Sequence, residues 1–187
     1  MATIAGDDRG PLGDGPLRRV VLTGPESTGK TTLVAELAIH YGTVCSAEFS
    51  RTYLDRKQAP LDDTDVEPIA RGQITNEDDA ALRASGLLIL DTDLVSTVVY
   101  SRYYYGRCPE WIAEAARDRL AQLYLLLQPD VPWVPDGEQR DRPAAREEMH
   151  RLFRYALQAF GARHVEIGGS WSERRLRAIA SIDAMRT

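Results

Sequence analysis

The chain has 187 residues, of which 43% are apolar and 27% are charged, and its formal net charge is −5. This length and balance predict one globular domain with a single core, and the negative charge argues against a protein whose main task is to grip nucleic-acid phosphates. No apolar run approaches the ~20 residues of a membrane helix. Cys45 and Cys108 lack the spacing of a zinc site. We therefore expect a cytoplasmic protein with neither a membrane nor a nucleic-acid partner, and the sequence leaves its oligomeric state open.

Short apolar runs alternate with helical patterns along most of the chain. The apolar runs predict five strands, at residues 18–23, 44–48, 87–90, 123–127 and 164–167. Spacings of three and four residues predict the helices, at residues 30–41, 66–85, 93–105, 110–120, 149–160 and from 171 onward. Such alternation predicts an α/β fold, with a five-stranded parallel sheet covered by helices on both faces.

Three segments depart from this regular alternation. Residues 1–16 are rich in Gly, Asp and Pro, which predicts a flexible lead-in to a single domain over 17–187. The helix at 66–85 is so polar that we expect it to face solvent. Residues 129–143 contain several prolines and a glycine and predict a loop.

The segment after the first predicted strand matches the motif G-x-x-x-x-G-K-[ST] at every fixed position, between a strand and a helix. The two glycines let successive backbone N–H groups point at phosphate oxygens, and the helix N-terminus adds partial positive charge. Lys30 would reach the β- and γ-phosphates, and the Thr31 hydroxyl would ligate Mg²⁺. We therefore predict an ATP and Mg²⁺ site, whose nucleotide-binding residues are Gly24, Glu26, Ser27, Thr28, Gly29, Lys30, Thr31 and Thr32.

Carboxylates follow two of the predicted strands. Asp91 closes a buried run, where a second Mg²⁺ partner is expected because the cation prefers oxygen ligands. If the strand continues past Asp91, the side chains of Asp91 and Asp93 point to the same face of the sheet. If the strand stops at Asp91, Asp93 is the N-cap of the next helix. Glu48, at the end of the second strand, is the first candidate for a base that takes a proton from an acceptor hydroxyl, and Asp93 is the second. An ordinary surface ion pair between Glu48 and Arg51 is the alternative.

The loop after the fourth strand is rich in arginine and suits a lid over the nucleotide. Arginines on such a loop can neutralise the charge that develops during phosphoryl transfer while the loop excludes water. The alternative is a solvated basic turn. The residues concerned are Trp133, Asp136, Gly137, Arg140, Arg142 and Arg146.

Several motifs together resemble the ribosylnicotinamide kinase domain of NadR-type proteins. They are GPESTGKTT, AEFSRTYL, IARGQITNED, the DTD of residues 91–93 and PDVPWVPDG, and the likeness runs over about residues 18 to 185. The resemblance implies a kinase that uses ATP to phosphorylate the 5′-hydroxyl of nicotinamide riboside. The spacing after Gly137 departs from the family pattern, so the division of work among the lid arginines stays open.

The resemblance also implies roles for individual residues. Glu48, Arg51, Asp91 and Asp93 would line the nucleoside and metal site, with Trp133 beside the substrate. Lys30, Glu48, Asp93, Arg140 and Arg142 would be catalytic, and Arg146 would bind ATP. The chain shows neither the H-x-G-H signature of an adenylyltransferase nor a DNA-binding helix-turn-helix, so we expect neither adenylyl transfer nor a repressor function.

Other functions remain open at this point. The only asparagine, Asn76, is followed by Glu, so the N-K-x-D motif of a GTPase is absent. A different nucleoside or nucleotide kinase and an ATP-binding regulatory module are the alternatives. A cationic pyridinium would favour carboxylates and aromatic faces. The aromatic residues near predicted strand ends are Phe49, Tyr53, Tyr100, Tyr103, Tyr104, Tyr105 and Trp111.

Overall fold

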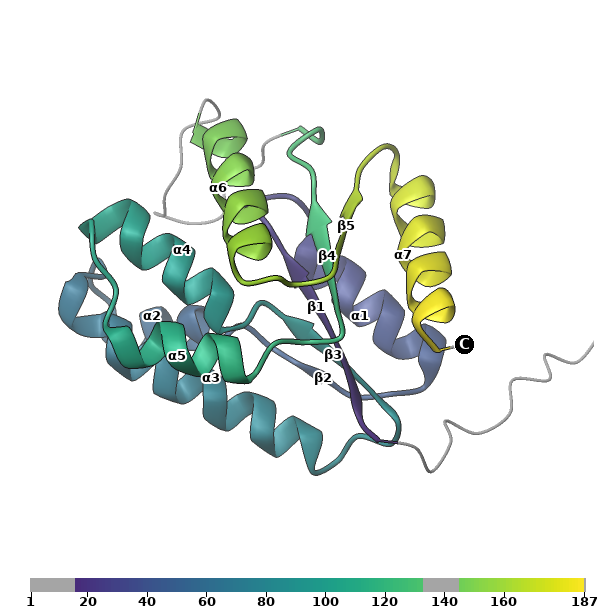
Figure 1. Ribbon diagram of the computed structural model, residues 1–187, viewed down its shortest axis with the longest axis horizontal. Coiled ribbons are helices and arrows are strands. Elements are labelled where there is room, and N and C mark those ends of the chain that lie inside the picture. Colours follow the sequence, from purple (N-terminus) through teal and green to yellow (C-terminus); the bar gives the residue numbers. More distant parts are fainter. Residues whose placement is uncertain (1–15, 133–144, 187) are drawn as a thin grey trace, which may run out of the picture.

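A computed structural model of the chain describes residues 16–132 and 145–186. Its sheet has the strand order β2-β3-β1-β4-β5, and every neighbouring pair is parallel (Figure 1). The strands are β1 (Arg18–Thr23), β2 (Cys45–Ser46), β3 (Leu87–Asp91), β4 (Leu123–Leu127) and β5 (His164–Ile167). The predicted five-stranded parallel sheet is confirmed. The second strand is shorter than expected and ends before Glu48.

Helices join the strands and cover both faces of the sheet (Figure 1). They are α1 (Lys30–Tyr41), α2 (Phe49–Lys57), a 3₁₀ turn η1 (Asp63–Asp65), α3 (Val66–Ala81), α4 (Leu94–Tyr105), α5 (Glu110–Asp118), α6 (Ala145–Ala159) and α7 (Trp171–Arg186). The sequence did not predict α2. None of its residues, all of them described, is buried, so it has no apolar stripe to reveal it.

The two faces of the sheet belong to two separate layers of the core. Alternate residues of a strand point to opposite faces. Accordingly, Leu88 and Leu90 pack with buried residues of α3, α4, α5 and α6, whereas Leu87 and Ile89 pack with buried residues of α1 and α7. Strands buried on both faces explain the continuous apolar runs in the sequence.

The expectation that residues 66–85 form a solvent-facing helix was wrong. Helix α3 buries one face, at positions spaced by three and four residues, namely Val66, Ala70, Gln73, Glu77 and Ala80. Two of these positions are polar, which hid the helical apolar period in the sequence.

Two predicted segments fall mostly outside the described residues. They are the lead-in, of which residues 1–15 are not described, and the loop at 129–143, of which 133–143 are not described. Within the two described stretches, no helix is both long enough and apolar enough to cross a bilayer.

Candidate functional site

The loop between β1 and α1 has the backbone that the glycine motif predicted. Gly24 and Gly29 have φ values of 126° and 84°, and Ser27 has a φ of 52°. A Cβ atom on Gly24 would lie 2.8 Å from the carbonyl oxygen of Leu127, and one on Gly29 would lie 2.8 Å from the Trp171 ring. Both positions therefore require glycine. Because Gly29 has no side chain to cap α1, the first N–H groups of that helix remain available to an anion.

Lys30 is the first residue of α1, and its side chain folds back over the loop. Its Nζ donates hydrogen bonds to the carbonyl oxygens of Gly24 at 3.0 Å and Pro25 at 2.8 Å, and the residue is 7% exposed. Burial lowers the pKa of Lys30 below its ordinary value, and the charges of the nearby carboxylates Glu48 and Asp91 partly oppose this fall. The ammonium group thus lies inside the loop and within electrostatic reach of both carboxylates.

Other residues of the motif support the loop or lie at its rim. The Thr28 hydroxyl is buried and donates to the carbonyl of Pro25 at 2.9 Å. Glu26 is partly buried and Thr32 is exposed at the start of α1.

Thr31 and Asp91, the predicted metal pair, lie side by side at the carboxyl ends of the strands. The Thr31 hydroxyl donates to Asp91 Oδ2 at 2.6 Å. Asp91 is 2% exposed, and its Oδ1 has no hydrogen-bond partner among the described residues. Burial raises the pKa of Asp91, and the charge of Lys30 opposes that rise. A buried carboxylate oxygen without a partner, next to a hydroxyl, fits a hard cation such as Mg²⁺.

Asp93 adopts the capping alternative. The strand ends at Asp91, and Thr92 has a φ of 65°. Asp93 Oδ1 then accepts hydrogen bonds from the N–H groups of Val95 at 3.0 Å and Ser96 at 3.4 Å, and Oδ2 accepts one from the Tyr124 hydroxyl at 2.6 Å. Burial raises the pKa of Asp93 to about 6, although these hydrogen bonds oppose the rise. The carboxylate therefore faces α4 and Tyr124.

Glu48 lies at the N-terminus of α2, at the edge of a pocket. Its carboxylate accepts hydrogen bonds from Ser50 Oγ at 2.6 Å and from Arg51 Nε at 3.2 Å. The ion pair with Arg51 that the sequence left as an alternative is therefore present. The same carboxylate also lines the pocket, so the two interpretations of Glu48 are compatible.

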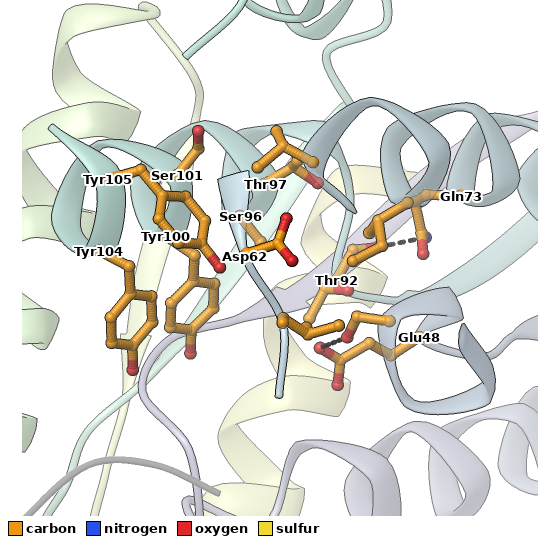
Figure 2. Close-up of a pocket in the computed structure, with 14 residues that line it drawn as sticks. Glu48, Asp62, Gln73, Thr92, Ser96, Thr97, Tyr100, Ser101, Tyr104 and Tyr105 are labelled. Atoms are coloured by element: carbon orange, nitrogen blue, oxygen red, sulfur yellow. Dashed lines mark hydrogen bonds between the residues drawn. The ribbon is translucent and has the colours of Figure 1, made fainter. Parts of the chain in front are cut away.

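The pocket lies between α3, α4 and the segment that joins α2 to α3. Tyr100, Tyr104 and Tyr105 gather at one end, and Glu48 and Thr92 lie at the other (Figure 2). The rings of Tyr100 and Tyr104 are stacked, with centroids 6.1 Å apart and an interplanar angle of 7°. A second carboxylate, that of Asp62, lies between the two ends (Figure 2).

The other four predicted aromatic residues pack elsewhere. Phe49 and Tyr53 contact each other on α2, and Tyr103 packs edge-on against Tyr104. Trp111 donates to Glu67 and lies under the Arg71 guanidinium.

Of the predicted lid residues, the structure describes Arg146. It is 5% exposed and donates hydrogen bonds to the carbonyl oxygens of Val131 at 3.0 Å and Ser27 at 3.3 Å. Burial lowers its pKa. The guanidinium is thus bound to the backbone of the phosphate loop. The remaining lid residues, Trp133, Asp136, Gly137, Arg140 and Arg142, lie outside the described residues.

Sequence reasoning missed Arg174, which is fully buried. It donates to the carbonyl oxygens of Thr28 at 3.3 Å, Gln128 at 3.0 Å and Gly169 at 2.9 Å, and it pairs with Asp130. Charged neighbours in the sequence made it look like a surface residue of α7. The available signal was its spacing of four and eight residues from the other buried positions of that helix, which are Ala178 and Ile182.

Comparisons with known proteins give one family and several relatives. A family model described as an AAA domain matches residues 19–174. The trifunctional NAD biosynthesis/regulator protein NadR of Escherichia coli (strain K12) is 33% identical over 125 residues, which are 65% of this chain and 30% of that protein.

Two solved structures resemble the fold closely. A crystal structure of NadR protein in complex with NR matches 90% of this chain and 51% of its own, with a TM-score of 0.74 and 26% identity. A NadR structure in complex with NAD and AMP-PNP has a TM-score of 0.71 and 24% identity, over 90% of this chain and 49% of that one. The present chain therefore spans about half the length of these solved chains and less than a third of the curated relative.

Proposed function

This chain belongs to the AAA domain family whose model matches residues 19–174, and on that premise we propose that it is a kinase. In this proposal it transfers the terminal phosphate of ATP to the 5′-hydroxyl of nicotinamide riboside, in NAD salvage. Residues 17–187 form the kinase domain, which acts in the cytoplasm.

One juxtaposition carries the proposal: the phosphate loop and an acidic, tyrosine-lined pocket meet at Glu48. Glu48 lines the pocket, and its charge raises the pKa of Lys30 inside the loop. Thr92 also lines the pocket, and it directly follows Asp91, which accepts a hydrogen bond from Thr31 at the end of the loop. A donor phosphate held in the loop and an acceptor held in the pocket would therefore meet beside Glu48. Such positioning supplies much of the catalysis in phosphoryl transfer.

The loop residues supply the ATP site. Its curled backbone and the N-terminus of α1 present N–H groups to phosphates, and Lys30 adds a positive charge. Thr31 and Asp91 would hold Mg²⁺, which when bound neutralises charge on the phosphate oxygens. A related NadR structure contains AMP-PNP, which supports ATP as the donor.

The pocket suits an acceptor with a positively charged ring. Asp62 and Glu48 provide carboxylates, which pair with Lys57 and Arg51 respectively, and three tyrosines provide aromatic rings. The tyrosines are Tyr100, Tyr104 and Tyr105. Both features favour a pyridinium cation over a neutral base. A related NadR structure holds NR, which supports nicotinamide riboside.

Glu48 is the residue we propose for proton transfer. Its carboxylate would accept the proton of the 5′-hydroxyl while that oxygen attacks the terminal phosphorus and the bond to ADP breaks. Asp93 is the weaker candidate, because Glu48 is among the residues that line the pocket and Asp93 is not, and Asp93 is buried under three hydrogen bonds. The phosphorylated nucleoside and ADP are the products.

A competition assay tests the proposal. The protein is given ATP, Mg²⁺ and equal concentrations of nicotinamide riboside, uridine and thymidine, and the products are identified by mass spectrometry. We expect the mononucleotide of nicotinamide riboside to form in equal amount to ADP. A preference for a neutral nucleoside would reject this acceptor, and ADP release that ignores every nucleoside would indicate a regulatory module instead.

Lys30→Ala serves as the inactive variant in the same assay. It should lower turnover by orders of magnitude because Lys30 acts on oxygens that gain charge during transfer, with an unchanged circular dichroism spectrum. Arg83→Ala is the matched control. Arg83 is exposed, and its side chain donates a hydrogen bond to the backbone carbonyl of Asp79, four residues earlier in the chain. Near-normal turnover in Lys30→Ala would reject the assignment of the loop.

A further inference from the structure

The middle of α3 carries a motif, residues 69–78, that the phosphate loop does not explain. Its central residue, Gln73, is 3% exposed and reaches the end of the pocket where Glu48 and Thr92 lie (Figure 2). A buried amide must form hydrogen bonds to offset its desolvation. Its partners therefore indicate what Gln73 holds in place.

The Gln73 amide joins three segments. Its Oε1 accepts a hydrogen bond from the backbone N–H of Phe49 at 2.9 Å. Its Nε2 donates to Glu77 Oε1 at 3.2 Å and to the carbonyl oxygen of Thr92 at 3.4 Å. One side chain thus connects the first turn of α2, the turn that follows β3 and the body of α3.

The orientation of this amide follows from its partners. The Phe49 N–H can only donate, so the amide oxygen must face it. On the other side, Glu77 Oε2 already accepts from Arg119 at 3.3 Å, which leaves Oε1 as an acceptor for the Gln73 NH₂ group.

The neighbouring residue, Gly72, also contacts Phe49, through the Phe49 ring. A Cβ atom on Gly72 would lie 2.1 Å from the ring of Phe49. The first residue of α2 is therefore held twice, through its ring on Gly72 and through its N–H on Gln73.

Gln73 caps the first N–H group of α2 from another helix. Glu48 is the N-cap residue of α2, but its own side chain makes no capping hydrogen bond there. An N-cap side chain normally accepts from the second or third N–H group of its helix and does not reach the first. Gln73 accepts from the first, that of Phe49, and the Glu48 carboxylate points to Ser50, Arg51 and the pocket.

We propose that Gln73 is a positioning residue for the kinase reaction: by holding the first N–H group of α2 from α3, it fixes the preceding residue, Glu48, with its carboxylate at the pocket. This inference rests on the proposed function, in which Glu48 takes the acceptor proton. Gln73 acts through Glu48 and touches no reacting atom in this scheme.

The kinetic test uses Gln73→Met, which keeps the side-chain length and removes the hydrogen bonds. We expect kcat to fall about tenfold or more, a part of the 10²–10⁴ that a positioned base contributes, while the KM for ATP stays within about twofold. Tyr41→Phe is the matched control. It removes the hydroxyl that donates its one hydrogen between the Ile179 carbonyl and Asp183 at the α1–α7 contact, so it should lower stability and leave kcat unchanged.

A double-mutant cycle separates positioning from a general structural effect. If Gln73 acts through Glu48, adding Gln73→Met to Glu48→Gln should lower kcat by less than about twofold. Multiplicative losses would overturn the proposal, as would an unchanged kcat in the folded single variant. If Gln73→Met does not fold, Gln73→Asn, which retracts the amide by one methylene, replaces it in the same cycle with the same two outcomes.

A second readout does not depend on the acceptor. Hydrogen exchange at the Phe49 amide should become faster in Gln73→Met and stay slow in Tyr41→Phe; equal exchange rates in wild type and Gln73→Met would reject the cap. A wild type that phosphorylates a different nucleoside would reject only the acceptor, and the cycle is then measured with that nucleoside. A wild type that phosphorylates none would reject both proposals.

Discussion

Asp91 combines burial with an incomplete set of hydrogen bonds. One of its carboxylate oxygens accepts from Thr31, and the other has no partner within the described part of the chain. A buried charge with an unsatisfied oxygen costs free energy in the absence of a cation. A residue selected for stability alone would not have this arrangement, which favours metal binding as its role.

Asp91→Asn should therefore separate activity from stability. The amide oxygen can still accept from Thr31, so we expect the melting temperature without Mg²⁺ to be equal to or higher than that of the wild type. Turnover at low Mg²⁺ should fall by about 10- to 100-fold, as for other partners of metal sites, and should recover in part at high Mg²⁺. Turnover that is insensitive to Mg²⁺ concentration in both proteins would contradict a metal role.

Glu77 gives the protein a pH-dependent stability. Burial raises its pKa from 4.5 to about 7, the charge of Asp93 adds to the rise, and Gln73 and Arg119 oppose it. The folded state therefore binds the proton more tightly than the unfolded state. The contribution is fully present below pH 4.5 and is lost as the pH rises through 7, at a cost on the order of 3 kcal/mol.

Chemical denaturation across pH tests this expectation. The free energy of unfolding of the wild type should fall more steeply between pH 5 and pH 8 than that of Glu77→Gln, which does not titrate. Parallel pH profiles for the two proteins would show that Glu77 is ionised in the fold throughout this range.

Among the elements, helix α2 packs so closely on α3 that Gly72 leaves no room for a side chain. Replacing a glycine inside a helix by alanine usually stabilises the helix by about 1 kcal/mol. At Gly72 the added methyl would meet the Phe49 ring at 2.1 Å, so the start of α2 must shift. We expect Gly72→Ala to lower kcat for the proposed reaction despite the gain in helix propensity.

Thr75→Ala is the matched control on the exposed face of the same helix. It raises helix propensity without approaching α2, so it should stabilise the protein slightly and leave kcat unchanged. Both variants are compared by thermal unfolding and steady-state kinetics. A Gly72→Ala protein with normal kcat would show that α2 tolerates the displacement.

The predictability of each element followed its pattern of burial. The strands and α1, α4, α5, α6 and α7 were predicted because apolar runs or apolar stripes mark them. Helix α3 was placed correctly and its environment was misjudged, because Gln73 and Glu77 occupy two of its buried positions. Helix α2 was missed because it buries no apolar stripe of its own.

On the scale of the whole molecule, Arg174 joins segments that are distant in the chain. Its guanidinium links α7 to the phosphate loop at Thr28 and to the end of β4 at Gln128. Arg174→Met should destabilise the fold by about 3 kcal/mol, because several backbone carbonyls lose a buried charged donor. It should also weaken ATP binding, because the loop loses a support.

Thermal unfolding with and without ATP measures both effects. The increase in melting temperature on adding ATP should be smaller in Arg174→Met than in the wild type. Arg175→Met is the control, since Arg175 lies next to it on the exposed side of α7 and makes one long contact with Glu36, at 3.7 Å. An equal ATP shift in all three proteins would leave Arg174 with a role in folding alone.

The sequence by itself determined the features whose causes are local. Residues 24–31 indicate their own loop, because Gly24 and Gly29 permit positive φ angles just before a helix; the contacts with Leu127 and Trp171 that exclude a side chain there are tertiary. The short apolar runs, alternating with helical patterns, predicted the parallel sheet. The pairing of Thr31 with Asp91 could be predicted because the carboxyl ends of parallel strands meet at one edge.

Only the tertiary structure decided which polar side chains are buried and what they hold. Asp93 accepts a hydrogen bond from Tyr124 of β4, Gln73 caps the first N–H group of another helix, and Arg174 reaches the phosphate loop from α7. Each contact joins residues that are far apart in the chain, and each depends on distances that no local pattern encodes. A buried hydrogen bond is stabilising only when both partners arrive at the same place, and that place exists only in the folded chain.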